Sequence, residues 1–362
     1  MSFEGLASVI IDNGSHTMKA GFSGDYQPKE CFPTIVWRQT GMIGLGDTPI
    51  AVGERASGYR RDSLRFPIRR GKIVDWDDME VIWRRIFTHY LAADMETTPA
   101  LLTESPSKNS KEDREKMIQV LFDAMELPSV YIANQAVTTL FGCDKVNGLV
   151  LESGHGSSHT VPVYEGYALS HATESLDLGG LDVTEYLKRK VDERNESKLS
   201  FGIVEDIKEK HCYILMDCEK SRENEKVSYE LPDETVILLG DELYEASECL
   251  FNPSLIDFNC KGIHENIIPL IEKCDQDIRN ELYRNIVLGG GNTLLKGFRN
   301  RIEKECNKIS PIEVSICETN HAQFSSWKGA SILAQTSQFI DLSISRKDYQ
   351  EYGSKIVHRK FF

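Results

Sequence analysis

The chain has 362 residues, with 42 Lys and Arg against 56 Asp and Glu, which gives a formal net charge of −14 at neutral pH. A chain of this length predicts two core-bearing lobes, because single cores rarely grow so large. The negative charge argues against general nucleic-acid binding, which depends on surplus Lys and Arg. Direct membrane insertion is not expected, because no apolar run approaches the ~18 residues that a spanning helix needs.

The cysteines and the N-terminal segment indicate the cellular compartment. The nine cysteines are scattered, odd in number and without a C-x-x-C pair. This pattern is typical of a reduced intracellular protein, and it favours neither a disulfide framework nor a zinc site. The opening MSFEGLAS lacks the basic segment and apolar stretch of a signal peptide, so none is predicted.

The first predicted element is a strand that ends in a turn. Val9, Ile10 and Ile11 are apolar and β-branched or strand-forming, and the turn-forming run from Asp12 to Ser15 follows them directly. Such a strand delivers a carboxylate and several backbone N–H groups to one point, as a phosphate-binding turn requires. His16 occupies the position where the turn would most simply carry a second small residue.

Two amphipathic helices are predicted next, over residues 76–91 and 110–128. In the first, apolar residues recur at helical spacing, and Asp77 with Glu80 is predicted to form a capping box. The second has Met117, Leu121 and Met125 on one face. Both apolar faces are interpreted as core-facing, because amphipathic helices normally bury that side.

A second copy of the opening pattern spans residues 146–166. Leu149 to Leu151 form the predicted strand, the run from Glu152 to Gly156 the turn, and residues 158–163 a return strand. The repeat predicts two halves of similar build, each with an acidic turn. Two such turns facing one another across a cleft would clamp the phosphates of a nucleotide and its metal ion.

Two further glycine turns follow apolar strands. Gly179 and Gly180 precede a predicted helix that starts near Asp182, and the run from Gly289 to Gly291 joins a strand to a helical segment. Turns of this kind place N–H groups where phosphate binds. Strands alternating with helices predict an α/β fold, and the polar run 218–228 is interpreted as a solvated loop.

The chain resembles actin in order and over essentially its whole length. The resemblance rests on these segments: IIDNGSHTMKAGFSGD, WDDMEVIW, LLTESP, REKMIQVLF, IANQAV, HTVPVYEGYAL, DIKEKHCYI, GIHENI, CDQDIRNELYRNIVLGGG and IVHRKFF. It implies the two-lobed, four-subdomain α/β fold of actins, heat-shock chaperones and sugar kinases. It also implies ATP or ADP with Mg²⁺ or Ca²⁺ in the cleft, and it identifies the chain as a divergent actin or actin-related protein.

The resemblance also implies subdomain boundaries. Subdomain 1 would comprise residues 1–32, 67–142 and 325–362, and subdomain 2 residues 33–66. Subdomain 3 would comprise residues 143–178 and 259–324, and subdomain 4 residues 179–258. The segment 253–265 resembles the hydrophobic plug, and residues 40–46 resemble a shortened DNase-binding loop, which in actins docks into the next subunit of a filament.

The functional residues that the resemblance implies fall into three groups. The catalytic residues are Gln135, which positions the attacking water, together with Glu152 and His159. Asp12 and Glu152 are expected to hold the metal ion through water. The nucleotide-binding residues are Asp12, Gly14, Ser15, His16 and Lys19 in the first loop; Ser153, Gly154, His155 and Gly156 in the second; and Gly180, Asp182, Lys208, Glu209, Gly289, Gly290 and Gly291 around ribose and adenine.

The departures from the actin pattern concentrate near the phosphates. His16 replaces a glycine, Glu152 and His155 replace aspartates, and Arg70 replaces a histidine. Mg²⁺ is usually steadied by one or two carboxylates, so losing one should weaken its water shell. Phosphate charge favours protonated imidazole, which could restore some of the balance. We therefore expect nucleotide binding with slow or absent hydrolysis.

The two histidine-bearing turns have other interpretations. His16 could point away from the loop, and a zinc site at His155 and His159 is disfavoured because no further ligands converge. On the adenine side, Leu295, Gln323 and Gly202 replace residues of the family pattern, which puts base selectivity in doubt.

We expect an ATP-binding cytoskeletal or scaffold subunit, at most a weak ATPase. Its partners would be actin-family subunits or actin-binding proteins, and its setting the cytoplasm and cytoskeleton. The alternatives are a nuclear actin-related subunit of a chromatin-remodelling complex, which a shortened loop at 40–46 would favour, and a small-molecule kinase of the same superfamily. No acceptor-substrate motif supports the kinase.

Overall fold

The chain folds into two compact units. The computed structural model describes residues 7–39, 50–195, 198–216, 226–317 and 321–361. Unit 1 comprises residues 1–146, 165–168 and 324–362, and unit 2 comprises residues 147–164 and 169–323. The predicted loop at 40–46 and most of the polar run at 218–228 lie outside the described residues. None of the helices within the described ranges is both long and apolar enough to span a membrane.

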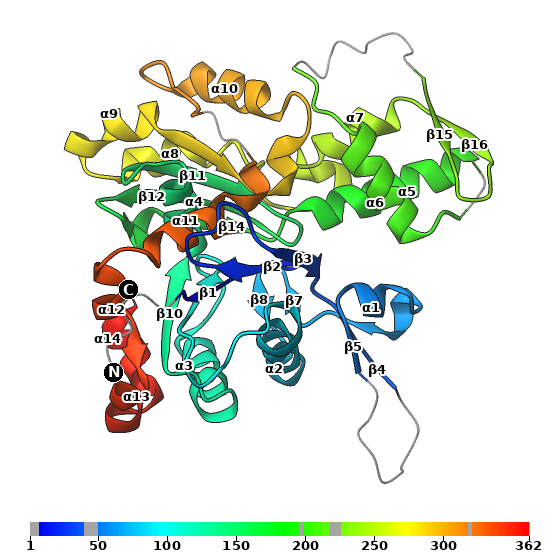
Figure 1. The fold of residues 1–362 in the computed structure, drawn as a ribbon. Helices are drawn as coiled ribbons and strands as arrows, with labels where there is room; N and C mark the ends of the chain where they lie inside the picture. Colours follow the sequence, from blue (N-terminus) through cyan, green and yellow to red (C-terminus); the bar gives the residue numbers. More distant parts are fainter. Residues whose placement is uncertain (1–6, 40–49, 196–197, 217–225, 318–320, 362) are drawn as a thin grey trace. The chain divides into compact units, whose positions relative to one another are not determined.

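Unit 1 is built on a six-stranded mixed sheet (Figure 1). The strand order is β18-β10-β9-β1-β2-β3, in which β1, β9 and β10 run parallel, β2 pairs antiparallel with β1, and β3 pairs antiparallel with β2. The strands are β1 Val9–Asn13, β2 Thr17–Phe22, β3 Glu30–Pro33, β9 Ala100–Glu104, β10 Ser129–Asn134 and β18 Ile344–Ser345.

Smaller elements surround this sheet in unit 1. The strands are β4 Val36–Arg38, β5 Ile50–Val52, β6 Leu64–Arg65, β7 Ile68–Arg69, β8 Lys72–Ile73 and β13 Tyr167–Ala168. The helices are α1 Glu54–Ser57, α2 Trp76–Arg85, α3 Lys111–Gln119, α4 Gln135–Gly142, α11 Ser325–Leu333, α12 Gln338–Leu342, α13 Arg346–Tyr352 and α14 Val357–Lys360. The two predicted amphipathic helices are thereby confirmed, and each ends in a π-helical turn, Ile86–Tyr90 or Val120–Ala124.

Alternation along β1 divides the core of unit 1 into two layers. Val9 and Ile11 pack in one cluster with Met79 and Trp83 of α2. Ile10 points to the other face and packs with Trp327 of α11, as expected because successive side chains of a strand face opposite sides. Helices therefore cover both faces of the fully buried β1. One of them, α11, lies more than 300 residues after β1 in the sequence.

One predicted helix start is wrong. The N-cap of α2 is Asp75, whose side chain accepts from the Asp78 backbone N–H at 3.0 Å. Asp75 has the extended backbone that an N-cap needs (φ −138°, ψ 102°), whereas Asp77 already lies within the helix. The second helix has the reciprocal capping box, between Ser110 and Asp113.

The sheet of unit 2 repeats one arrangement of unit 1, an antiparallel hairpin whose first strand also pairs with a parallel strand. The hairpin of β11 Gly148–Ser153 and β12 Ser158–Tyr164 pairs in parallel with β17 Ile286–Gly289 through β11, while β14 Glu174–Leu176 pairs with β12. A separate ribbon is formed by β15 Val227–Glu230 and β16 Val236–Leu239. The predicted return strand at 158–163 is confirmed.

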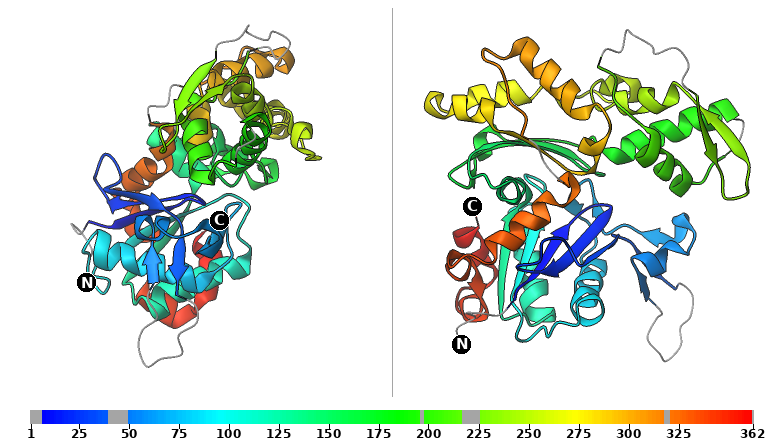
Figure 2. Two further views of the ribbon diagram at one scale, coloured as in Figure 1. Left: turned by 90° about the vertical axis from the view of Figure 1, so that its right-hand side faces the viewer. Right: turned by 45° about the horizontal axis from the view of Figure 1, so that its top comes forward.

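The helices of unit 2 supply most of its core. They are α5 Gly180–Asn195, α6 Phe201–His211, α7 Glu242–Glu248, α8 Ile267–Lys273, α9 Gln276–Arg284 and α10 Phe298–Ile309. Figure 2 shows α5 and α6 side by side. Leu149 and Leu151 of β11 contribute to the same apolar cluster as these helices. In the plug-like segment, Ile256 and Phe258 pack against that cluster while Leu255 is exposed.

Both strands of the predicted repeat are longer than expected. The structure places Asp12 and Asn13 within β1, and Glu152 and Ser153 within β11. Cross-strand pairing continues through these polar residues, because each acid has a partner directly opposite it: Lys19 for Asp12 and His159 for Glu152. The turns proper are therefore only residues 14–16 and 154–157.

Candidate functional site

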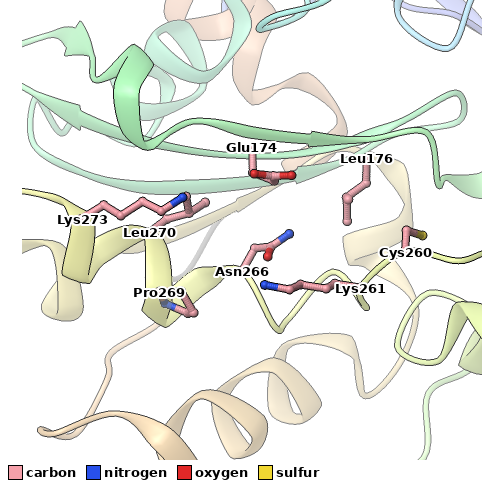
Figure 3. Close-up of a pocket in the computed structure, with 8 residues that line it drawn as sticks. All are labelled: Glu174, Leu176, Cys260, Lys261, Asn266, Pro269, Leu270 and Lys273. Carbon is pink, nitrogen blue, oxygen red and sulfur yellow. The ribbon is translucent and has the colours of Figure 1, made fainter.

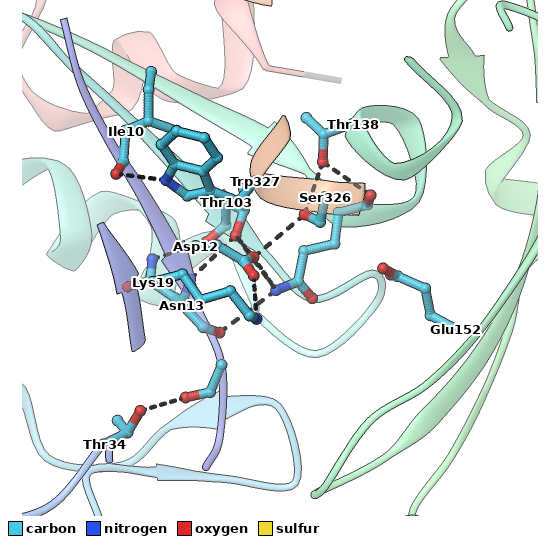
Figure 4. Close-up of polar contacts among 12 residues, drawn as sticks. Ile10, Asp12, Asn13, Lys19, Thr34, Thr103, Thr138, Glu152, Ser326 and Trp327 are labelled. Atoms are coloured by element: carbon cyan, nitrogen blue, oxygen red, sulfur yellow. Dashed lines mark hydrogen bonds and ion pairs between the residues drawn. The ribbon is translucent and has the colours of Figure 1, made fainter. Parts of the chain in front are cut away.

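The carboxylate of Asp12 is the centre of a buried polar network in unit 1 (Figure 4). Its Oδ2 lies 2.7 Å from Nζ of Lys19, and its Oδ1 accepts from Oγ1 of Thr103 at 2.6 Å. Burial alone would raise its pKa, but the Lys19 cation and the surrounding hydrogen bonds outweigh burial and hold the pKa of Asp12 below its ordinary value. Asp12 is therefore an ionised carboxylate near neutral pH.

Gln135 joins the same network from the start of α4. Asn134 caps this helix through its side chain, which accepts from the Ala136 backbone N–H at 2.9 Å. Nε2 of Gln135 donates to Oδ1 of Asp12 at 3.0 Å. Oγ of Ser326, from α11, donates to the same oxygen at 3.3 Å. The predicted catalytic glutamine and the predicted metal-holding carboxylate are thus brought together.

The backbone of the first turn is fixed by neighbouring loops. Thr34 donates its hydroxyl to the carbonyl of Gly14 and its N–H to the carbonyl of His16, both at 2.7 Å. A Cβ at Gly14 would lie 2.3 Å from the carbonyl oxygen of Thr17, so only glycine fits there. The hydroxyl of Ser15 accepts from the backbone N–H of Gly71 at 3.0 Å.

The Gly71 contact brings Arg70 to this turn. Arg70 and Gly71 connect β7 to β8, and both have positive φ, 51° and 80°. Positive φ at both central residues is the geometry of a type I′ hairpin turn. The residue that replaces the family histidine therefore sits at the tip of a two-residue hairpin whose backbone is bonded to Ser15.

Glu152 and His159 form the corresponding pair in unit 2. The two residues face each other across β11 and β12, and Nε2 of His159 lies 2.6 Å from Oε2 of Glu152. Both side chains are at least nine-tenths buried. Nδ1 of His159 is buried and has no hydrogen-bond partner among the described residues. The predicted catalytic histidine is therefore bonded to the predicted metal-holding glutamate.

Three glycine turns meet around the second loop. The N–H of Gly180 donates to the carbonyl of Gly154 at 2.9 Å, and the N–H of Leu181 to that of His155 at 2.8 Å. A Cβ at Gly179 would lie 2.6 Å from the carbonyl oxygen of His155. A Cβ at Gly290, where φ is +84°, would lie 2.4 Å from the carbonyl oxygen of Ser153. Glycine is thus required where these backbones touch.

Side chains tie the three turns together. Nδ2 of Asn292 donates to Oγ of Ser153 and to the carbonyl of Gly154, each at 2.9 Å. The carboxylate of Asp182 accepts from the N–H of Gly179 at 2.8 Å. Nζ of Lys208 donates to Oγ1 of Thr184 at 3.0 Å, one turn into α5. The structure therefore gathers most of the predicted nucleotide-binding residues of unit 2 in one place.

His155 has an acidic neighbour that the sequence does not reveal. Its Nδ1 lies 3.6 Å from a carboxylate oxygen of Glu205, on α6. Glu205 and Lys208 are three residues apart and so share one face of that helix. The next predicted residue, Glu209, is exposed and makes none of the contacts described for these turns.

The remaining predicted residues lie at the edges of this arrangement. Gly289 ends β17 as the parallel partner of Glu152, and Gly291 begins a short 3-10 turn, Gly291–Leu294. A Cβ at Gly291 would meet nothing within 4 Å. The amide oxygen of Gln323 is buried and has no hydrogen-bond partner within the described ranges. Its neighbour Ala322 accepts from the N–H of Gly290 at 3.2 Å.

Sequence reasoning missed several residues of these networks. Thr103, Ser326 and Asn292 were not predicted, although Thr103 lies in LLTESP and Asn292 directly follows the glycine run. Thr103 lies near the end of β9, Ser326 in the first turn of α11 and Asn292 in a 3-10 turn, and a small polar residue at such a position is a weak signal by itself. Their importance comes from partners far away in the sequence.

Each of the two α/β units has a buried carboxylate beside a glycine turn, an arrangement that suits phosphate binding. The family model described as Actin matches residues 3–362, so this chain belongs to the actin family. The resemblance inferred from the sequence is confirmed, as is the α/β fold. Actin-family proteins generally bind an adenine nucleotide with a divalent cation, and their partners are actin-like subunits or actin-binding proteins. The subdomain boundaries stay a prediction.

The described residues fit a nucleotide and a divalent cation. Both oxygens of Asp12 already have protein partners, so contact with a metal ion through water suits it better than direct ligation. The open space beside Gly291 and the unpartnered amide oxygen of Gln323 suit a ligand against the turns of unit 2. A buried polar atom without a partner is costly, and a bound molecule can supply one.

Proposed function

We propose that this protein is an ATP-binding, actin-like subunit of a filament or a larger assembly in which hydrolysis is slow or absent. Family membership and the convergence of glycine turns support nucleotide binding. The bond between His159 and Glu152, 2.6 Å long and buried, supports slow hydrolysis. That single observation concerns the two residues that would have to act on water and metal.

The proposed binding roles follow from the contacts within each unit. The N–H groups of the turns at 14–16 and 154–157 would bind phosphate oxygens. Asp12 and Glu152 would orient metal-bound water, and the turns at Gly180 and Gly290 would receive ribose and adenine. The divalent cation, when bound, would neutralise part of the phosphate charge.

The proposed slow hydrolysis rests on how the catalytic candidates are bonded. Nε2 of His159 is occupied by Glu152, and Nε2 of Gln135 by Asp12. General acid–base help requires a group within hydrogen-bond reach of water. Each of these nitrogens is already bonded to a carboxylate, which leaves it less available to a water molecule. Because His155 replaces an aspartate of the family pattern, a further carboxylate that could accept hydrogen bonds from water is lost.

Release of the bound nucleotide tests the proposal. Purified protein is denatured, the released nucleotide is identified by chromatography, and light scattering of the intact protein is followed after Mg²⁺ and salt are added. We expect bound ATP, with phosphate released far more slowly than by a conventional actin under the same conditions. ATP turnover as fast as that of conventional actin would contradict the proposal, as would a chain that binds no nucleotide.

The same experiment separates the assembly types. Scattering that rises with Mg²⁺ and salt supports a filament subunit in the cytoskeleton of the cytoplasm, which we propose as the main setting. Bound ATP without polymerisation supports a subunit of a larger assembly, including a nuclear chromatin-remodelling complex. A small-molecule kinase would instead consume ATP when an acceptor is added.

A further inference from the structure

Unit 2 contains a cavity of about 310 Å³ between β14 and α8 (Figure 3). Leu176, Pro269 and Leu270 give it an apolar wall. Its polar lining comes from Glu174, Asn266, Lys261 and Lys273, and the thiol of Cys260 completes it. The volume lies at the lower end of the range for ligand pockets. None of these residues belongs to the predicted nucleotide-binding set.

Asn266 is the most informative residue of the lining. Only 6 % of Asn266 is exposed, and its side chain has no hydrogen-bond partner among the described residues. It occupies the N-cap position of α8, where asparagine normally accepts from a backbone N–H of the first turn. Here that bond is absent, and Pro269, at the third helical position, has no N–H to donate to the Asn266 side chain. The amide lines the cavity instead.

The charged groups of the lining are also unpaired. Within the described part of the chain, Glu174, Lys261 and Lys273 make no ion pair with each other or with another residue. Figure 3 shows the Asn266 amide and the Lys261 ammonium directed toward the same part of the cavity. Two cations, one anion and an unpartnered amide therefore surround a space whose wall is otherwise apolar.

This lining specifies the chemistry of a ligand. Two ammonium groups favour a carboxylate, and the Glu174 carboxylate favours a hydroxyl or ammonium donor. The amide of Asn266 can donate to the first group or accept from the second. The wall formed by Leu176, Pro269 and Leu270 favours a short hydrocarbon portion. A molecule without one of these three parts would leave a lining group without a contact to the ligand.

We propose that this cavity is a binding site for a small carboxylate that carries a hydroxyl or ammonium group and a short hydrocarbon chain. None of the lining residues belongs to the nucleotide turns, so the proposal does not rest on the proposed ATP binding. Binding would supply Asn266 with the partner that the fold does not provide, and would join β14 to α8 through the ligand.

Three probes that share one branched hydrocarbon chain test the proposal on the full chain. Leucate has all three parts, isocaproate lacks the hydroxyl, and isoamyl alcohol lacks the carboxylate. Titration calorimetry is expected to show binding of leucate and affinities at least about tenfold weaker for the other two, because each loses a charge-assisted hydrogen bond. No heat from leucate at the limit of its solubility would overturn the proposal.

Substitutions of lining residues test whether leucate binds in this cavity. The double variant K261Q/K273Q should lose about tenfold or more in affinity for leucate, and both side chains are exposed enough that the fold should survive. Lys198→Gln, an exposed lysine of unit 2 outside the cavity, is the matched control and should bind as the parent does. Equal affinities of the double variant and the parent would place leucate elsewhere and overturn the proposal.

Cys260 provides an independent readout. Its thiol is exposed at the cavity, and burial together with the carboxylates of Asp182 and Glu265 raises its pKa, so alkylation is best followed at alkaline pH. Leucate should slow iodoacetamide labelling of Cys260, measured by peptide mass spectrometry, while labelling of the exposed Cys31 in unit 1 stays unchanged. Labelling of Cys260 that leucate does not slow would count against the site.

Discussion

The carboxylate of Glu152 and the imidazole of His159 lie 2.6 Å apart as direct cross-strand partners in β11 and β12. Only 10 % of the Glu152 side chain and 6 % of the His159 side chain are exposed. Since Nδ1 of His159 has no partner within the described ranges, the imidazole depends on this one bond. The contact therefore stabilises the strand pair that carries the second turn.

Glu152→Ala tests that contact. The substitution leaves His159 buried without a hydrogen bond, which should cost about 1–3 kcal/mol of local stability. Hydrogen exchange of residues 148–164, followed by mass spectrometry, should accelerate accordingly. Glu193→Ala, at an exposed position of α5, is the control and should not change it. Unaltered exchange in Glu152→Ala would show that the bond adds nothing.

Asp12 should make the stability of unit 1 depend on pH. Its pKa in the folded chain is below the ordinary value of 3.8, so its contribution is complete at neutral pH and is lost as the pH falls below about 4. Asp12→Asn should remove this dependence and cost about 3–5 kcal/mol at neutral pH, because Lys19 loses its buried partner. Tryptophan fluorescence during urea unfolding measures this, since all four tryptophans belong to unit 1. Asp62→Asn, an exposed position, should leave the pH profile unchanged.

The crossing of α4 and α11 should tolerate no side chain at Gly329. A Cβ there would lie 1.7 Å from the carbonyl oxygen of Thr138, so the helices would have to separate. Gly329→Ala should destabilise unit 1 by about 1–3 kcal/mol or more, again visible in tryptophan fluorescence. Gly58→Ala, where a Cβ would meet nothing within 4 Å, is the control. Equal urea midpoints for the two variants would contradict the close crossing.

Restoring the family residues in both turns should raise hydrolysis. The double variant H16G/H155D returns a small residue to the first turn and a carboxylate to the second. We expect phosphate release per bound nucleotide to rise at least about tenfold, because catalysis is sensitive to small displacements of water and metal. His171→Asp, at an exposed position of unit 2, should leave the rate unchanged. No change in the double variant would show that these histidines do not limit the rate.

Asn292 should hold the nucleotide turns in place. Asn292→Ala removes its bonds to Ser153 and Gly154, each worth about 0.5–1.5 kcal/mol, so bound nucleotide should exchange about tenfold faster. Displacement of a fluorescent ATP analogue measures the rate. Asn259→Ala, at an exposed position, should exchange as the parent does. An unchanged rate of nucleotide exchange in Asn292→Ala would show that this amide does not help to retain the nucleotide.

Local patterns in the sequence predict much of this fold. Apolar runs followed by turn residues locate β1 and β11, and helical spacing locates α2 and α3. The repeat at residue 146 predicts two halves of similar build. These signals succeed because they depend on residues that are neighbours along the chain.

Features that depend on distant partners could not be predicted in this way. The strands continue through Asp12 and Glu152 only because Lys19 and His159 stand opposite them, and Asp12 is also bonded to Gln135 and to Ser326 near the C-terminal end. The position of Glu205 beside His155 depends on how α6 packs. A resemblance can name the residues of a site, but it does not give the bonds between them.

The return of residues 324–362 to unit 1 has a consequence for synthesis. Trp327 covers one face of β1 and donates its Nε1–H to the carbonyl of Ile10 at 3.1 Å. Unit 2 has all its residues once the chain reaches Gln323, whereas β1 must wait for Trp327. Unit 1, whose first residues leave the ribosome first, is therefore the last unit to be completed. A chain that stops before Trp327 leaves one face of β1 uncovered.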